Sequence, residues 1–192
     1  MKKFRVTVAV LILVVLGLGY YAYLSSKETP TPAESLTEVS EIDKLIARDL
    51  EADYPNTPRK VLDFYSQITV CFYEEGLTDE NLQKLCDQSV KLFDDELLMV
   101  NPLSTFVENT KAEIEEFNAI ERVVTDYVLE ETSEIDFYKE DGRECAKISV
   151  KYFLYDESGF SRTYEDFLMR KDENGRWKIL GWQMTPANEQ EE

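Results

Sequence analysis

The sequence predicts an α+β domain that is held at a membrane by one N-terminal transmembrane helix. Three observations predict this fold class: an uncharged apolar run near the N-terminus, apolar residues at helical spacing from residue 41 to about 119, and alternating residues with Gly-ended turns after that point. The helices come first, so we expect them to pack together on one face of a curved, four-stranded antiparallel meander.

The apolar run covers residues 6–24 and contains no charged residue. As a helix it is about 28 Å long, close to the ~30 Å thickness of the hydrocarbon layer. Three basic residues, Lys2, Lys3 and Arg5, precede it. By the positive-inside rule, residues 1–5 lie in the cytoplasm and the C-terminal domain lies outside the cell membrane, as a single-pass signal-anchor protein of a bacterial envelope.

A cleaved signal peptide is the alternative for the same segment. Its cleavage site needs small residues, whereas Tyr20, Tyr21, Tyr23 and Leu24 are bulky. The run is also long for a signal sequence, so the pattern favours an anchor. Residues 25–40, which are polar and contain two prolines, then form a linker.

The helical part of the domain has four predicted helix starts, and three of them have a recognisable capping residue. Ser40, Thr57 and Thr78 have the side chains that cap helix N-termini, and Pro58 suits a first helical turn. The expected helices run from about 41 to 52, from 58 to near Gly76, from Thr78 through Phe93, and from Asn101-Pro102 through Phe117.

The strand part is divided by three four-residue turns that end in glycine. The turns are KEDG (139–142), DESG (156–159) and DENG (172–175). Each suits a type I turn that closes through a left-handed residue with a bulge. Residues 120–138 then form one bent first strand, and Trp177 and Trp182 fall on opposite faces of the last strand. The domain covers residues 41–186, and residues 187–192 form a flexible tail.

Composition excludes several classes of function. The chain has 39 acidic and 21 basic residues, which disfavours nucleic acid as a partner. It has no histidine, so Ser-His-Asp and Cys-His nucleophiles and imidazole metal sites are excluded. The acidic runs 94–96 and 113–116 lack EF-hand spacing and suit solvated helix ends, so we expect no metal and no cofactor.

Four residues are candidates for lining a pocket: Tyr65, Tyr152, Tyr164 and Asp126. Phenols and a carboxylate together supply hydrogen bonds and acid–base groups. The alternative is that tyrosines on strands only pack against their neighbours, as aromatic residues commonly do in sheets.

The three cysteines are expected to be free thiols. Cys71 and Cys86 lie on adjacent predicted helices, but their depths differ by roughly 6 Å of helix, which favours buried thiols over a disulfide. Cys145 follows the first turn, where we expect it to be exposed and reactive.

Two segments resemble nuclear-transport-factor-2-like domains. The first is TPRKVLDFY (57–65), which leads to Gly76 and the following helix, and the second is FLMRKDENGRWKI (167–179). The resemblance covers about residues 57–184 and implies a cone in which helices wrap a curved sheet around a pocket. In ketosteroid-isomerase-like members an aspartate base precedes a proline after the second helical stretch. Asn101-Pro102 stands there in this chain, so the base is missing.

These features favour a non-catalytic binding or interaction module over an enzyme. One alternative is an assembly subunit, since some inner-membrane components of type IV secretion systems resemble this plan. The other is a carboxylate and tyrosine enzyme of the same superfold. The expected partners are the lipid bilayer, through residues 6–24, and either a protein or a second copy of the chain.

Overall fold

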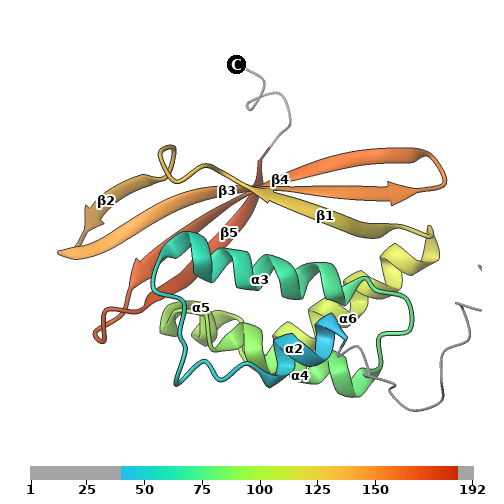
Figure 1. Ribbon diagram of the computed structural model, residues 1–192, viewed down its shortest axis with the longest axis horizontal. Helices are drawn as coiled ribbons and strands as arrows, with labels where there is room; N and C mark the ends of the chain where they lie inside the picture. The colour runs from blue at the N-terminus through green and yellow to red at the C-terminus, as the bar shows by residue number, and fades with distance from the viewer. Residues whose placement is uncertain (1–39, 186–192) are drawn as a thin grey trace, which may run out of the picture. The chain divides into compact units, whose positions relative to one another are not determined.

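Helices precede strands throughout residues 40–185, the part of the chain that the computed structural model describes (Figure 1). The helices are α2 (Glu41–Ala47), α3 (Pro58–Phe72), α4 (Asp79–Val90), α5 (Asp95–Val100) and α6 (Leu103–Ala119). The strands are β1 (Val123–Leu129), β2 (Asp136–Glu140), β3 (Arg143–Asp156), β4 (Gly159–Lys171) and β5 (Trp177–Thr185). The predicted α+β class is confirmed.

The predicted helix caps are confirmed. The side-chain oxygens of Ser40, Thr57 and Thr78 accept from the backbone N–H three residues further on, at 3.1, 3.2 and 3.2 Å. The first helix is shorter than predicted because Asp49 interrupts it. The Asp49 carboxylate accepts from the N–H groups of two following residues, at 2.9 and 3.2 Å, and this forms a turn where helix was expected.

Helix α5 was not predicted, because its acidic start was interpreted as a solvated helix end. Asp94 is instead buried, with 5% of its surface exposed, and its carboxylate accepts from the Glu96 N–H at 3.0 Å to cap α5. The same carboxylate forms a buried ion pair with Arg170 of β4. A charge-rich run therefore contains one residue of the interior, held there by a cation that lies 76 positions later.

The sheet has five strands, not the four predicted. Its order is β1-β3-β4-β5, and β2 also pairs with β3, so the expected single bent strand over 120–138 is two separate strands. The break between them is stabilised by Glu130. Its carboxylate accepts from the Ser149 N–H at 2.9 Å, while its own N–H donates to the Ser149 carbonyl at 3.0 Å. A side chain thus replaces a strand partner where the backbone leaves the sheet.

The first turn also differs from the prediction. Glu140 pairs with Arg143, so only Asp141 and Gly142 lie between the strands, with φ of 50° and 81°. Two successive positive φ values identify the two-residue turn whose twist matches that of a hairpin, and not a type I turn with a bulge.

A bulge in β5 places both tryptophans on the helix-covered face. Leu168 pairs with Gly181 whereas Met169 pairs with Ile179, so Leu180 is an extra residue. The extra residue reverses the alternation beyond it, and Trp182 stacks on Phe167 with centroids 5.7 Å apart. The prediction that Trp177 and Trp182 lie on opposite faces is therefore wrong.

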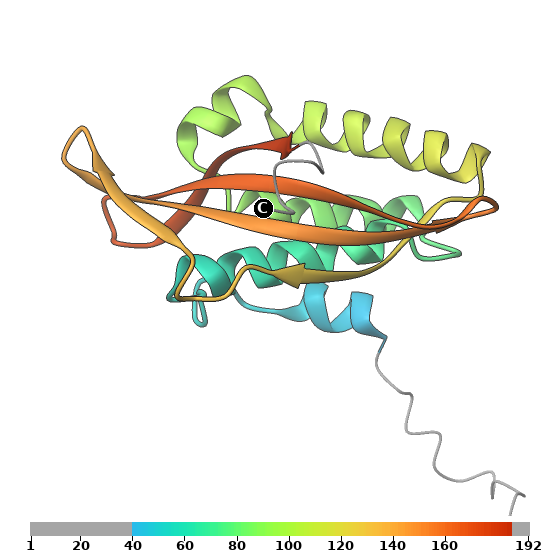
Figure 2. The same ribbon diagram turned by 90° about the horizontal axis from the view of Figure 1, so that it is seen from above.

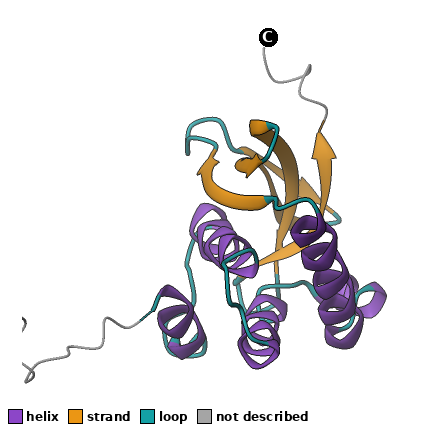
Figure 3. Cartoon of the chain, turned by 90° about the vertical axis from the view of Figure 1, so that its right-hand side faces the viewer, coloured by secondary structure: helices purple, strands orange, loops and turns teal. Residues whose placement is uncertain are grey.

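All five helices lie on one side of the sheet (Figures 1 and 3). Viewed from above, α3 and α6 run along the two sides of the central strands, and no helix of residues 40–185 lies on the outer face of the sheet (Figure 2). The core fills the space between, and its largest fully buried side chains include Phe64, Phe93, Phe167 and Ile148. α3 and α6 therefore form two walls with the sheet above them, and this arrangement positions the site.

The cysteine predictions are confirmed in part. Cys71, Cys86 and Cys145 are free and all three are buried. Burial raises the thiol pKa of Cys71 and of Cys86 to about 12. Cys145 is only 1% exposed, so the expectation of an exposed, reactive thiol there is wrong.

Within residues 40–185, none of the helices combines the length and hydropathy that crossing a bilayer requires. The predicted transmembrane segment at 6–24 and the predicted tail at 187–192 lie outside the described residues, as does nearly all of the predicted linker.

Candidate functional site: an aromatic cavity between α3, α6 and the sheet

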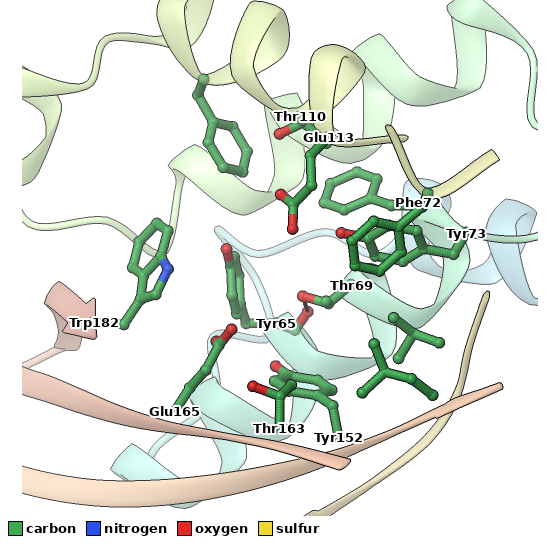
Figure 4. A pocket seen from close by; sticks show the side chains of 14 residues that line it. Tyr65, Thr69, Phe72, Tyr73, Thr110, Glu113, Tyr152, Thr163, Glu165 and Trp182 are labelled. Carbon is green, nitrogen blue, oxygen red and sulfur yellow. Dashed lines mark hydrogen bonds between the residues drawn. The ribbon is translucent and has the colours of Figure 1, made fainter. Parts of the chain in front are cut away.

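A cavity of about 120 Å³ lies between α3, α6 and the helix-facing side of the sheet (Figure 4). It is lined by seven aromatic rings, two glutamates, three threonines and two aliphatic residues: Tyr65, Thr69 and Phe72 of α3 and Tyr73 at its C-cap; Phe106, Thr110, Glu113 and Phe117 of α6; and Val124, Tyr152, Leu154, Thr163, Glu165 and Trp182 of the strands.

Simple periodicity explains why these side chains converge. On each helix the successive lining residues are three or four positions apart, and Tyr73 at the end of α3 follows Thr69 by four, which places them on one face. On the strands they lie in register: Tyr152 of β3 pairs with Thr163 of β4, and Glu165 pairs with Val150. Since Val150 is fully buried on the helix-facing side, Glu165 must point to the same side.

Glu165 is a carboxylate in an apolar environment. Burial, together with the nearby charge of Glu113, raises its pKa from 4.5 to about 7. No ion pair or hydrogen bond to the Glu165 carboxylate is formed by any residue between 40 and 185. Its charge therefore has no compensation from the described part of the chain, and half of the molecules carry a proton there near neutral pH.

Glu113 extends into the cavity from the opposite side. It is exposed on α6, as expected for a solvated helix face, yet it also lines the mouth of the cavity. Figure 4 shows the two carboxylates approaching from opposite sides, with Tyr65 between them. Tyr73 is close to Glu113, and burial followed by that charge raises the Tyr73 pKa.

The two buried tyrosines differ in their hydrogen bonding. The Tyr152 hydroxyl lies 3.1 Å from the Ser66 hydroxyl, within hydrogen-bond distance. Tyr65 is only 6% exposed, and its hydroxyl has no partner among the described side chains and backbone groups. Burial raises the Tyr65 pKa well above its usual value, so this group is a neutral donor or acceptor directed at the cavity.

Aromatic rings hold the walls in place. Trp182 contacts the Tyr65 ring at 5.9 Å between centroids, and Tyr73 packs on Phe117 at 4.6 Å. Such pairs are stabilised by about 1 kcal/mol beyond the burial of their area, so the cavity has stiff walls.

Two of the four predicted site residues lie in this cavity. Tyr65 and Tyr152 are brought together, whereas Tyr164 and Asp126 are not. Tyr164 points to the outer face of the sheet, where the Lys151 ammonium lies 5.2 Å from its ring centre. Asp126 is exposed and accepts from the Tyr127 N–H at 2.8 Å. Neither of them lines this cavity, and Tyr164 instead borders a separate depression of about 430 Å³.

A bulge explains why Asp126 does not line this cavity. Val124 faces the interior, and simple alternation would place Asp126 on the same side. The register shifts by one residue between them, which sends Asp126 outward. For Tyr164 the cause is alternation itself, since its neighbour Glu165 faces inward.

Glu165 and Glu113 were not among the predicted site residues, although the sequence contains a signal for each. Glu165 alternates with Phe167 and Met169, so a charged side chain stands on the apolar face of a strand. Glu113 shares helical spacing with Phe106 and Phe117. A charge in phase with core residues is the pattern that points to a site.

Metal ligands are not grouped in the described range: no three His, Cys, Asp or Glu side chains of residues 40–185 are placed to hold an ion. The groups that converge on the cavity are two carboxylates, phenol hydroxyls and ring faces. These groups are suited to hydrogen bonding, proton transfer and contact with positive charge.

Comparison with known proteins gives a family but no activity. Residues 1–182 match the family described as Domain of unknown function (DUF6715). No curated protein matches the chain. Among solved structures, a protein from Catenulispora acidiphila is similar at 10% identity, over 68% of this chain and 92% of that one, with a TM-score of 0.41. A likeness of this size carries no argument about function.

Proposed function

The chain belongs to the DUF6715 family, whose function is unknown, and from its cavity we propose that the domain binds a small molecule between α3, α6 and the sheet. One observation carries the proposal: the hydroxyl of the buried Tyr65 side chain and the Glu165 carboxylate open onto the cavity without a partner in residues 40–185. Buried polar groups are almost always hydrogen-bonded, so groups left open at a cavity are suited to a ligand.

The proposal includes a membrane tether and a fold relationship. Residues 6–24 anchor the chain in the cell membrane with the domain outside the cytoplasm, which the uncharged run and its basic start support. The domain is a cone of the nuclear-transport-factor-2-like type. Helices that precede a sheet and cover one of its faces support this, as does a cavity between the two layers.

The volume of the cavity limits the size of the ligand. A water molecule occupies about 30 Å³ of liquid, and an engineered cavity of ~150 Å³ holds benzene. A cavity of about 120 Å³ therefore suits a ligand, or a ligand group, of a few heavy atoms. The polar groups at opposite sides would fix its orientation.

An acid–base enzyme is the second candidate, and the pKa of Glu165 favours it. A carboxylate with a pKa of about 7 exchanges protons efficiently near neutral pH, and Tyr65 lines the same cavity. Binding and catalysis share the cavity, but only catalysis would convert the bound molecule. Recovery of a chemically altered ligand after incubation would favour the enzyme.

Filling the cavity is expected to abolish ligand retention. Thr163→Leu adds bulk to the cavity wall, whereas Ser161→Leu adds the same side chain two residues away at an exposed position of β4. Native mass spectrometry of the full-length protein, extracted from its membrane in mild detergent, measures the result. We expect a small-molecule adduct on the wild type and on Ser161→Leu, and none on Thr163→Leu.

Two outcomes would contradict the proposal. One is a wild-type protein without any adduct that also gains none from a library of small molecules. The other is an adduct of unchanged occupancy on Thr163→Leu. A ligand-free oligomer of defined stoichiometry would instead favour an assembly subunit.

A further inference from the structure

We infer that the cavity selects a small organic cation, such as a methylated ammonium group; this inference rests on the proposed function and names its ligand class. The Tyr65 side chain is buried, and its hydroxyl opens onto the cavity without a partner in the described range, which marks the place where the ligand binds. Charge and ring geometry then determine which ligand fits.

The charge around the cavity is negative. Neither Glu113 nor Glu165 forms an ion pair with any lysine or arginine that the structure describes. Lys111, which lies on α6 as Glu113 does, pairs with Asp79 at 2.9 Å instead. A neutral ligand would leave two like charges facing each other, whereas a cation would compensate both.

The walls suit the same ligand. Ring faces attract cations by about 0.5–2 kcal/mol, more when the contact excludes water. Within the described residues no lysine or arginine lies over the rings of Tyr65, Tyr73 or Trp182. No cation of the described chain therefore competes with a ligand for these rings, unlike the Phe117 ring, which the Arg122 guanidinium approaches at 5.7 Å.

A neighbouring depression adds to the negative potential. It measures about 320 Å³ and shares the side chains of Phe72 and Tyr73 with the cavity. Its charged lining residues are Glu74, Glu75, Asp79, Glu115 and Lys111, and Lys111 is paired with Asp79. A cleft with an excess of one sign of charge raises the local concentration of the opposite ion. An anionic ligand would be repelled here before it reached the cavity.

Protons compete with such a ligand. Glu165 faces Tyr65 and Tyr73 of α3, Tyr152 of β3 and Glu113 of α6. The three tyrosines have raised pKa values, so Glu113 is the one charge of the described lining that faces it. Protonation of Glu165 removes half of the negative charge, and a cation that cannot titrate should therefore bind more weakly at low pH.

The experiment is calorimetric titration of the full-length protein in mild detergent. The probes are tetramethylammonium chloride and tert-butanol, a neutral molecule of similar size and shape. We expect tetramethylammonium to bind at least tenfold more tightly than tert-butanol at pH 8. Its affinity should be about tenfold higher at pH 8 than at pH 6, because a carboxyl group with a pKa near 7 is mostly ionised only at the higher value.

Three variants test which carboxylates are responsible for binding the cation. Glu165→Gln should weaken tetramethylammonium binding about tenfold to hundredfold and abolish its pH dependence. Glu113→Gln, at the exposed mouth, should weaken binding without an effect on folding. Glu116→Gln removes the same charge from an exposed position of α6 outside the cavity lining, and should bind as the wild type does.

The outcomes separate this inference from the proposed function. Equal binding of the two probes, or a neutral adduct in the native mass spectrum, would contradict the inference that the ligand is a cation. The proposed ligand-binding site would still stand. Failure of both probes in a protein that also carries no adduct overturns both. Binding that Glu165→Gln leaves unchanged, in a variant with wild-type circular dichroism, also overturns the inference.

Discussion

Glu165→Gln is expected to stabilise the ligand-free domain by about 3 kcal/mol at pH 8. In the folded state burial and Glu113 raise the pKa of Glu165 from 4.5 to about 7. Between these two values the folded state holds a proton that the unfolded state has released, so the free energy of unfolding falls as pH rises from 4.5 to 7. Each pKa unit corresponds to about 1.4 kcal/mol. Glutamine keeps the shape of the protonated group and does not titrate.

The measurement is chemical denaturation at a series of pH values, followed by tryptophan fluorescence. The difference between wild type and Glu165→Gln should be near zero at pH 4, grow through pH 4.5–7, and level off above pH 7. Glu116→Gln, which is exposed, should differ from the wild type by less than about 0.5 kcal/mol throughout. A difference that does not change with pH would contradict the buried-carboxylate account.

Asp94→Ala is expected to destabilise the domain by about 3–5 kcal/mol, because it leaves a buried charge without its main partner. Two atoms of the Arg170 guanidinium donate to the Asp94 carboxylate at 3.1 and 2.5 Å, and the two side chains are 10% and 6% exposed. Without Asp94 the Arg170 charge stays buried, with only the more exposed Glu96 at 2.9 Å as a partner. The N-cap of α5 is lost as well.

The control is the double variant Asp94→Leu with Arg170→Met. Replacing both charges by apolar groups of similar size should recover most of the lost stability, because no charge is then left without a partner. Lys84→Ala, which breaks the exposed pair with Glu80, should change stability by less than about 1 kcal/mol. Urea denaturation measures all three. A loss below 1 kcal/mol in Asp94→Ala would show that the pair is open to water.

The features that the sequence predicts correctly are those that depend on neighbours in the chain. Ser40, Thr57 and Thr78 cap helices because a short polar side chain reaches the backbone three residues on. The glycines that end the turns adopt positive φ for an equally local reason. Tyr65 and Tyr152 follow from helical spacing and strand alternation, which explains why both reach the cavity as expected.

The errors arise where one inserted residue changes the face of a strand. The bulges near Thr125 and Leu180 send Asp126 outward and bring Trp182 inward. A bulge depends on how two strands pair, and alternation along one strand does not contain that information. The buried pair of Asp94 and Arg170 is equally non-local. Glu165 is different, because its phase with Phe167 and Met169 is visible in the sequence.

If the cavity binds a small cation, the fluorescence of Trp182 should report the binding directly. Trp182 lines the cavity and Trp177 does not, so Trp177→Phe leaves one fluorophore at the site. In that variant we expect tetramethylammonium to change Trp182 fluorescence in a saturable way at pH 8, more weakly at pH 6, and not at all once Thr163→Leu is added. If the fluorescence does not change, or if the change persists in the presence of Thr163→Leu, the cavity does not bind the cation.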